Sequence, residues 1–353
     1  MTAATNVIPL KYDSSPLTTN SGLSNVTPQG RDFGWSDRGA EPGPAAMPSR
    51  ADGMSGYLHP GYAGSLGEFG CPRALPRSGA YVLQRSIPGS TDRDAMGCYP
   101  LLCCADWSGL PEDLSDLKDL VSLACVADPL ATCDRSDLER WFDVVLDFKP
   151  HFVTELRRPV EAIVSRSHQA AVRRALKHVD VEICADPAAH LGEWVGLYDC
   201  LIQRHGITGI RAFSRAAFAR QLALPGMVMF RATSRGGRAI GMDLWYVQGD
   251  VAYGHLAASS RLGYELRASY ATKWHVLRHF HGKLRWLELG GAAGTQPRAA
   301  GGLSAFKRGW ATGTRMAHLC GKVLDRPRYE ALGAARGAGG APYFPAYRQG
   351  EFA

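Results

Sequence analysis

The sequence predicts a mixed α/β layer fold, in which helices cover a largely antiparallel sheet. Three apolar segments, 227–233, 239–247 and 251–258, are separated by the short turn sequences SRGG and QGD, as in an antiparallel meander. Helical patterns precede and follow the meander, and a buried strand, LRWLEL, comes after the later helix. This order differs from the regular alternation of strands and helices that builds a parallel sheet.

The composition is that of a globular protein that begins with a polar segment. Of the 353 residues, 45% are hydrophobic and 21% are charged, which argues against wholesale disorder. Residues 1–75 are rich in Ser, Thr, Gly, Pro and Asn and show no helical or strand period, so we predict an arm there that is disordered or lies loosely on the protein. No apolar run reaches the length of a membrane span and no secretory signal pattern is present, which predicts a soluble, cytoplasmic protein.

Cysteine usage and charge narrow the function classes further. The nine cysteines are scattered and form no C-x-x-C pair, so we expect reduced thiols and neither a disulfide framework nor a zinc site. The net charge of +7 suits a phosphate-rich partner such as coenzyme A or RNA, although an arginine-rich proteome would give the same value.

Residues 76–160 predict a small α/β lobe. Apolar and polar residues alternate in GAYVLQRSI, which predicts a strand. The periodicity of the next stretch, LPEDLSDLKDLVSLACVAD, predicts a short helix followed by an apolar strand. The stretch SDLERWFDVVLDFKPHFVTEL predicts a helix that Pro150 ends, because its first apolar residues share one helical face: Leu138, Trp141, Phe142 and Val145.

Residues 161–350 predict a second, larger lobe. It opens with a basic helix, SHQAAVRRALKHV, followed by a helix that starts at Asp186–Pro187 and stops at Gly206, and by a short helix after Ser214. After the meander we expect a long helix over about 263–281, the strand LRWLEL, a Gly-rich loop, a short helix around LSAFKRGW and a last strand near 314–323.

Three stretches of the second lobe carry a family resemblance: SRSHQAAVRRALKHVDVEI, YGHLAASSRLGYELRASYATKWHVLRHFHGKLRWLELGG and GLSAFKRGW. With the element order, they make the chain similar to the FemAB-like branch of the GNAT acyltransferase superfamily. The resemblance implies two fused GNAT-type lobes, of which the first is reduced and the second complete. It also implies transfer of an aminoacyl group from tRNA, or of an acyl group from coenzyme A, to an amine.

The resemblance assigns substrate-binding roles to particular residues. Phe306 and Lys307 match the donor-side Phe-Lys pair of the family. Arg261 and Gly263 lie where coenzyme A-dependent members carry a Q/R-x-x-G-x-G/A loop, but this chain has one glycine there, so the loop is incomplete. By similarity, Arg204 and His205 border the acceptor site, while their plain alternative role is to cap the C-terminus of a helix.

Acyl transfer to an amine also needs residues that handle charge and protons. The ammonium of Lys307 can stabilise charge that develops on an ester or thioester carbonyl. His255, in the third strand of the meander, and Asp243, within IGMDLWYV, are candidate bases for the amine. Each has a structural alternative, since strand histidines are often satisfied within a core and buried carboxylates are often paired.

Two other motifs do not carry the chemistry that they resemble. His275 and His279 have the spacing of a zinc-binding helix but lack the glutamate of H-E-x-x-H, so no metal site is expected. The stretch WLELGGAAG resembles the cofactor loop of a methyltransferase, but too little of the chain follows it to form the βα units that such a fold requires. It is not a P-loop either, because no G-K-[ST] follows it.

The sequence therefore predicts an N-acyltransferase that works by direct attack of an amine and has no tightly bound cofactor. Its donor is acyl-coenzyme A or aminoacyl-tRNA, its acceptor is a small-molecule or peptide amine, and tRNA is its candidate macromolecular partner. The alternative is a non-catalytic GNAT-fold binding module with a basic nucleic-acid groove. Steep salt dependence without turnover would favour that alternative.

Overall fold

The computed structural model of the chain describes residues 54–291, 301–337 and 343–351. Its strands lie in one 11-stranded sheet. In chain order they are β1 (Cys71–Leu75), β2 (Ala80–Ser86), β3 (Arg93–Gly97), β4 (Ser122–Val126), β5 (Val144–Glu155), β6 (Val179–Cys184), β7 (Met227–Ser234), β8 (Ala239–Gln248), β9 (Val251–Ser259), β10 (Trp286–Gly291) and β11 (Gly313–Val323). Across the sheet the order is β1-β2-β3-β4-β11-β5-β10-β9-β8-β7-β6, so the mixed α/β prediction is confirmed.

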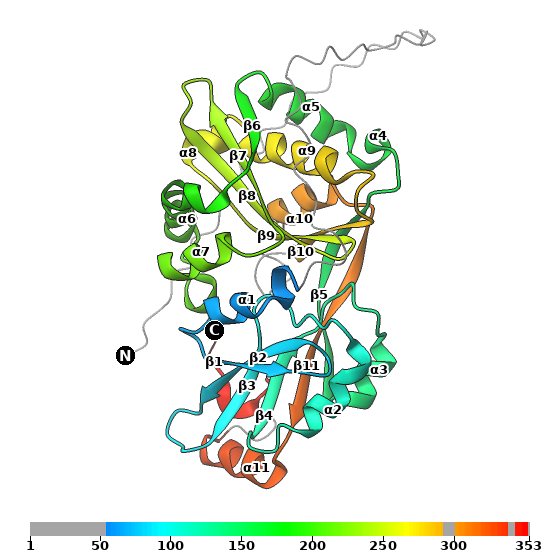
Figure 1. Ribbon diagram of the computed structural model, residues 1–353, viewed down its shortest axis with the longest axis vertical. Coiled ribbons are helices and arrows are strands. Elements are labelled where there is room, and N and C mark those ends of the chain that lie inside the picture. The colour runs from blue at the N-terminus through cyan, green and yellow to red at the C-terminus, as the bar shows by residue number, and fades with distance from the viewer. Residues whose placement is uncertain (1–53, 292–300, 338–342, 352–353) are drawn as a thin grey trace. The chain divides into compact units, whose positions relative to one another are not determined.

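Helices cover both faces of this sheet (Figure 1). The α-helices are α1 (Pro60–Ser65), α2 (Leu110–Ser115), α3 (Arg135–Trp141), α4 (Val160–Ile163), α5 (Arg166–Ala175), α6 (Leu191–His205), α7 (Arg215–Leu222), α8 (Arg261–Glu265), α9 (Ala268–Phe280), α10 (Gly301–Arg308) and α11 (Arg326–Ala335). Short 3-10 turns are η1 (Gly56–Leu58), η2 (Trp107–Gly109), η3 (Pro187–His190), η4 (Gly209–Arg211) and η6 (Ala346–Arg348).

The second lobe contains the predicted meander, β7-β8-β9, with antiparallel pairing throughout. Helices α6 and α7 bury Trp194 and Phe218 on one face of it, and α9 buries Val276 and Phe280 on the other. Local signals fix the helix ends: the Ser214 hydroxyl accepts a hydrogen bond from the backbone N–H of Ala217 at the start of α7. The short edge strand β6, which pairs with β7, has no counterpart among the predicted strands.

The long helix that we expected over 263–281 is two helices, α8 and α9. They are separated at Arg267, which has a left-handed backbone with φ of 61°. Within α8, Gly263 lies against the sheet so closely that a Cβ atom there would be 2.1 Å from the carbonyl oxygen of Ile240. The glycine therefore serves the packing of α8 on β8.

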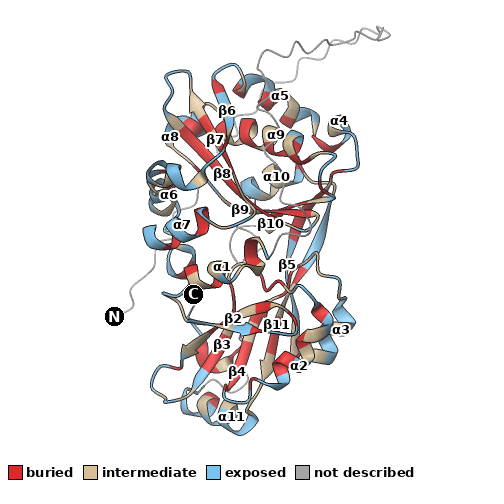
Figure 2. Cartoon of the chain, in the orientation of Figure 1, coloured by how far each residue is buried: buried red, intermediate tan, exposed pale blue. Residues whose placement is uncertain are grey.

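The first lobe packs around its own core and includes the end of the chain. Leu110 and Leu114 of α2 bury against Leu123 of β4 and Cys320 of β11. Tyr347 packs with Ile87 and Val121. Chain segments that the sequence placed in a second lobe spanning 161–350 thus contribute to the first lobe (Figure 2).

Strands β5 and β11 connect the two lobes into one sheet. They pair antiparallel from Gly313↔Val153 to Gly321↔Val144, while β10 pairs with the end of β5 and β4 with the end of β11. The helix expected up to Pro150 is therefore wrong beyond α3. The β-branched and alternating run VVLDFKPHFV is a strand, and Pro150 is tolerated because the β10 pairing begins at His151.

The disordered arm predicted for 1–75 is wrong for the residues that the structure describes, 54–75. Tyr57, Tyr62 and Leu66 are buried in the core of the second lobe. The Tyr62 hydroxyl donates a hydrogen bond to the carbonyl of Tyr99 in the first lobe, and Ser65 accepts one from the side chain of Gln221 in α7 at 3.2 Å. A few aromatic residues within this otherwise polar segment bury enough apolar surface to hold it against the protein.

A buried ion pair ties the C-terminal segment to the first lobe, and it gives the first testable prediction. The Arg348 guanidinium donates to both carboxylate oxygens of Asp94, at 2.5 and 2.8 Å, and both side chains are buried. Asp94→Ala leaves a buried cation without its closest partner, so we expect the free energy of unfolding to fall by about 3–5 kcal/mol. Urea denaturation measures this.

Asp116→Ala is the matched control, because Asp116 pairs with Arg77 at the exposed surface and its loss should change stability little. Equal stabilities of the two variants would contradict a role of the Asp94–Arg348 pair in holding the C-terminal segment.

Candidate active site

The candidate site lies where two neighbouring parallel strands separate. β9 and β10 pair only from Val251↔Trp286 to Tyr253↔Glu288. Beyond that point β9 continues with β8, and β10 continues with β5 as far as Gly291. Each strand has a register shift near the separation, so backbone groups at the opening leave the sheet ladder and become available to another molecule.

Glu288 and His151 form a buried acid–imidazole pair beside this opening. His151 Nδ1 lies 2.9 Å from Glu288 Oε1, which also accepts a hydrogen bond of 2.6 Å from the backbone N–H of Gly290. Glu288 is 3% exposed. Because the flanking Leu287 and Leu289 belong to the core under α9, Glu288 points to the opposite face of the sheet, the α6 side.

Lys307 reaches the same opening from α10. Its ammonium donates a hydrogen bond of 2.7 Å to the carbonyl oxygen of Gly291. Burial lowers the pKa of Lys307 to about 8, while the negative charge of Glu288 acts in the opposite direction. The side chain of Lys307 therefore changes its protonation state near physiological pH.

Two glycines make room for these side chains. A Cβ on Gly290 would be 2.9 Å from the Lys307 nitrogen, and Gly290 has a φ of 79°. A Cβ on Gly291 would meet Lys149 at 2.5 Å and His151 at 3.0 Å. The Gly-Gly pair that follows LRWLEL is thus required by the packing of three basic side chains. The predicted Gly-rich loop that follows is mostly at 292–300, outside the described residues.

Asp243 is buried on the α9 side of the sheet and paired. Lys273 of α9 lies 2.7 Å from Asp243 Oδ2 and also stands over the ring of Trp245, 4.4 Å from its centroid. Burial raises the pKa of Asp243, and Lys273 counteracts the rise. Asp243 and Lys307 influence each other's pKa electrostatically, so the fold brings these two predicted residues into one neighbourhood.

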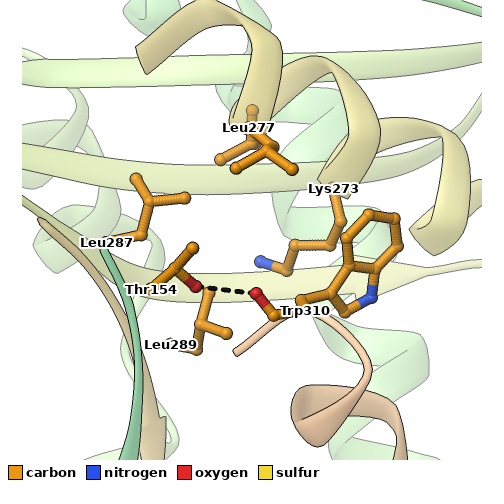
Figure 3. A pocket seen from close by; sticks show the side chains of 7 residues that line it. Thr154, Lys273, Leu277, Leu287, Leu289 and Trp310 are labelled. Atoms are coloured by element: carbon orange, nitrogen blue, oxygen red, sulfur yellow. Dashed lines mark hydrogen bonds between the residues drawn. The ribbon is translucent and has the colours of Figure 1, made fainter. Parts of the chain in front are cut away.

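A small cavity adjoins Lys273 (Figure 3). Its volume is about 10 Å³, close to the space that one water molecule needs. Thr154 closes one side by donating a hydrogen bond of 2.8 Å to the carbonyl of Trp310. The lining is otherwise mostly apolar: Val276, Leu277, Leu287, Leu289 and Trp310. The cavity has no room for a long acyl chain.

His255 lies on the α6 side of the sheet, within the aromatic core. Its Nδ1 is 3.2 Å from the Tyr57 hydroxyl, and its Nε2 is 3.2 Å from Gln221 Oε1. Burial lowers the pKa of His255 to about 3, so the ring is neutral near pH 7 and is a weak base. A register shift at His255 interrupts the regular alternation of side chains along β9. Ala258, three residues further on, therefore packs into the same core as His255, where regular alternation would have placed Ala257.

The residues predicted to bind substrates fall into two groups. Phe306 packs against Tyr270 and Trp310, and its carbonyl accepts a hydrogen bond of 2.9 Å from His168 of α5. Arg204, at the end of α6, stacks on Tyr264 of α8 with its guanidinium 4.0 Å from the ring centroid.

The remaining predicted positions lie in or next to that second group. On α8, the exposed Arg261 pairs with Glu265 at 3.0 Å, and the N–H of Gly263 donates to the Ser260 hydroxyl at 3.2 Å. Burial and the neighbouring Arg204 lower the pKa of His205. The binding roles of Phe306, Arg204, His205, Arg261 and Gly263 stay predictions.

Sequence reasoning missed Glu288 and His151. One signal for Glu288 was present: a carboxylate within the apolar strand LRWLEL must have a partner, because an unpaired buried charge is costly. His151 gave no comparable signal, because it directly follows Pro150, where the predicted helix ends. The strand pairing Gly291↔His151 is what brings the two residues together.

Residues 164–308 match the family described as the acetyltransferase (GNAT) domain. This match covers the meander, the helices on both sides of it, β10 and the helix that carries Lys307. The chain contains a GNAT acetyltransferase domain, which spans residues 164–308. The predicted enzyme class, an acyltransferase, is thereby confirmed. A search of curated proteins found no match to the chain.

Solved structures extend the similarity over most of the described chain. FemX is 14% identical, with a TM-score of 0.57, and the match covers 77% of this chain and 92% of FemX. The C-terminal domain of a putative lysylphosphatidylglycerol synthetase from Agrobacterium fabrum is 13% identical, with a TM-score of 0.53 and coverage of 75% and 89%. L-PGS from Bacillus licheniformis is 11% identical, with a TM-score of 0.51 and coverage of 77% and 94%. The described chain thus shares the fold of these proteins, as its resemblance to the FemAB-like branch implied.

Two kinds of feature are absent from the described part of the chain. None of the helices in residues 54–291, 301–337 and 343–351 is long and apolar enough to cross a membrane. Within the same ranges, no three His, Cys, Asp or Glu side chains are placed to hold a metal ion.

The coupling between Glu288 and Lys307 gives a second prediction. Glu288→Gln removes the negative charge that opposes the effect of burial, so the pKa of Lys307 should fall below about 8. A pH titration of the lysine side-chain nitrogen signals by NMR measures this. The exposed Lys118 serves as the internal control, and an unchanged Lys307 titration would contradict the coupling.

Proposed function

We propose that this GNAT chain transfers an aminoacyl group from tRNA to the amine of a peptide or small-molecule acceptor by direct attack. The observation that carries the proposal is the convergence of Lys307 and the Glu288–His151 pair at the opening between β9 and β10. A cation at a developing oxyanion and a carboxylate near an attacking amine are the groups that such a reaction needs.

In the proposed reaction, the acceptor enters from the α6 side and the donor ester lies beside Lys307. The Glu288–His151 pair takes a proton from the amine, whose nitrogen forms a bond to the ester carbonyl carbon. Lys307 stabilises the negative charge on the carbonyl oxygen. The bond from that carbon to the ribose oxygen then breaks, and the ribose hydroxyl is restored by the proton taken from the amine. Freed backbone N–H groups of β9 assist Lys307.

We assign supporting roles to His255 and Asp243, which the sequence suggested as bases. The pKa of His255 is about 3 and both of its ring nitrogens have partners, so it organises the aromatic core. Asp243 holds Lys273 beside Trp245. The Asp243–Lys273 pair in turn adjusts the charge around Lys307.

Two features favour an aminoacyl ester of tRNA over an acyl-coenzyme A thioester. The coenzyme A loop is incomplete, and its one glycine is used for packing on Ile240 and for the Ser260 cap. Lysylphosphatidylglycerol synthetase, which shares the fold, is named for a lysyl-bearing product. Acyl-coenzyme A remains the second candidate because the matched family is described as an acetyltransferase.

Substitution of Lys307 tests the mechanism. Lys307→Ala should lower kcat by about 10²–10³-fold, the usual effect of losing an oxyanion-stabilising group. In the wild type, activity should fall as pH rises through about 8, because Lys307 then loses its charge. Lys307→Arg should move this loss to higher pH, since a guanidinium stays protonated. Full turnover by Lys307→Ala would rule out the role, and Lys118→Ala controls for removal of a lysine.

Donor identity can be tested by thermal shift and by amine-dependent turnover. Charged tRNA should raise the apparent stability by about 2.7 kcal/mol at a concentration one hundred times its Kd. Uncharged tRNA at the same concentration should raise it less. A shift with acetyl-coenzyme A alone would instead establish the second candidate. Binding of tRNA without turnover for any added amine would indicate a non-catalytic binding module.

A further inference from the structure

A basic pocket lies on the second lobe, between the end of α5 and the junction of α8 and α9. Its volume is about 330 Å³, and six residues line it: Arg174, Lys177, His178, Glu265, Leu266 and Arg267. Four of these six are basic residue types, and they come from two separate segments of the chain. The pocket is distinct from the opening that contains Lys307, Glu288 and His151.

The cations of this pocket are not neutralised by the protein. Glu265 is the one acidic lining residue, and its carboxylate is engaged by Arg261 at 3.0 Å. Among the residues that the structure describes, Arg174, Lys177 and Arg267 take part in no ion pair, whereas arginines elsewhere, such as Arg231, contact two carboxylates. Like charges that converge without a counterion repel one another, and a bound anion would remove that repulsion.

The backbone that carries these side chains is held in place. Arg267 has the left-handed conformation that breaks the helical path between α8 and α9. The carbonyl of Lys177 accepts a hydrogen bond of 2.6 Å from Arg235. α5 is fixed at its other end by His168, whose ring contacts those of Phe306 and Trp310. The backbone around the pocket is therefore held by contacts within the protein.

We propose that this pocket binds a backbone phosphate of the RNA donor, away from the reacting ester. The inference rests on the proposed function, because it takes tRNA as the donor. Arg166 and Arg173, also exposed on α5, continue the basic surface beyond the pocket, which suits a polyanion with repeated phosphates. The pocket lies at the end of α8, whereas Arg261 and Gly263, the positions of the incomplete coenzyme A loop, lie nearer its start.

Charge reversal in the pocket tests the proposal. Lys177→Glu and Arg174→Glu should raise KM for full-length charged tRNA by about tenfold or more and leave kcat unchanged, since phosphate contacts supply affinity and not chemistry. A short aminoacylated RNA that carries only the 3′ end should show no change. The salt dependence of tRNA binding should weaken by a slope of about 0.7–0.9 for each phosphate that the variant no longer neutralises.

Lys118→Glu is the matched control, because Lys118 is an exposed lysine of the first lobe. Equal KM values for Lys177→Glu and Lys118→Glu would overturn the proposal, as would weaker binding of acetyl-coenzyme A with unchanged tRNA binding. If the wild type transfers nothing from either donor but binds tRNA through Lys177, the pocket assignment holds and the proposed function fails.

Discussion

The pairing of β5 with β11 is the constraint on which the rest of the structure depends. These long strands belong to both lobes at once, because β10 extends the sheet from β5 and β4 extends it from β11. The register of β5 also decides which of its side chains face the opening. A shift of one residue would move His151 to the opposite face of the sheet and separate it from Glu288.

The candidate site is an arrangement of buried charges that limit one another. Burial, Lys273 and Lys149 lower the pKa of Lys307, while Glu288 and Asp243 raise it. Such an arrangement is costly for folding unless each group has partners, and the backbone of Gly290 and Gly291 supplies two of them, to Glu288 and Lys307. An ammonium whose pKa is close to 8 is the result, and it can respond to charge that appears during a reaction.

The N-terminal segment 54–66 shows how few residues can connect two lobes. Tyr57 and Tyr62 enter the core that contains His255 and Tyr246, and their rings meet edge to face. The hydroxyl of Tyr57 also forms a hydrogen bond with Nδ1 of His255. The aromatic core therefore rests on residues that lie far apart in the sequence, and their burial accounts for the low pKa of His255.

The sequence by itself determined the local features of this protein. The meander, the basic helix and the caps at Ser214 and Gly206 follow from periodicity and turn chemistry. The resemblance of the stretch around Lys307 to known acyltransferases indicated acyl transfer. Tertiary structure decided what depends on contacts between distant segments. It made 144–155 a strand, folded 54–75, broke the long helix at Arg267 and placed His151 beside Glu288. The physical reason is that strand pairing and burial involve partners more than a hundred residues away, which no local pattern encodes.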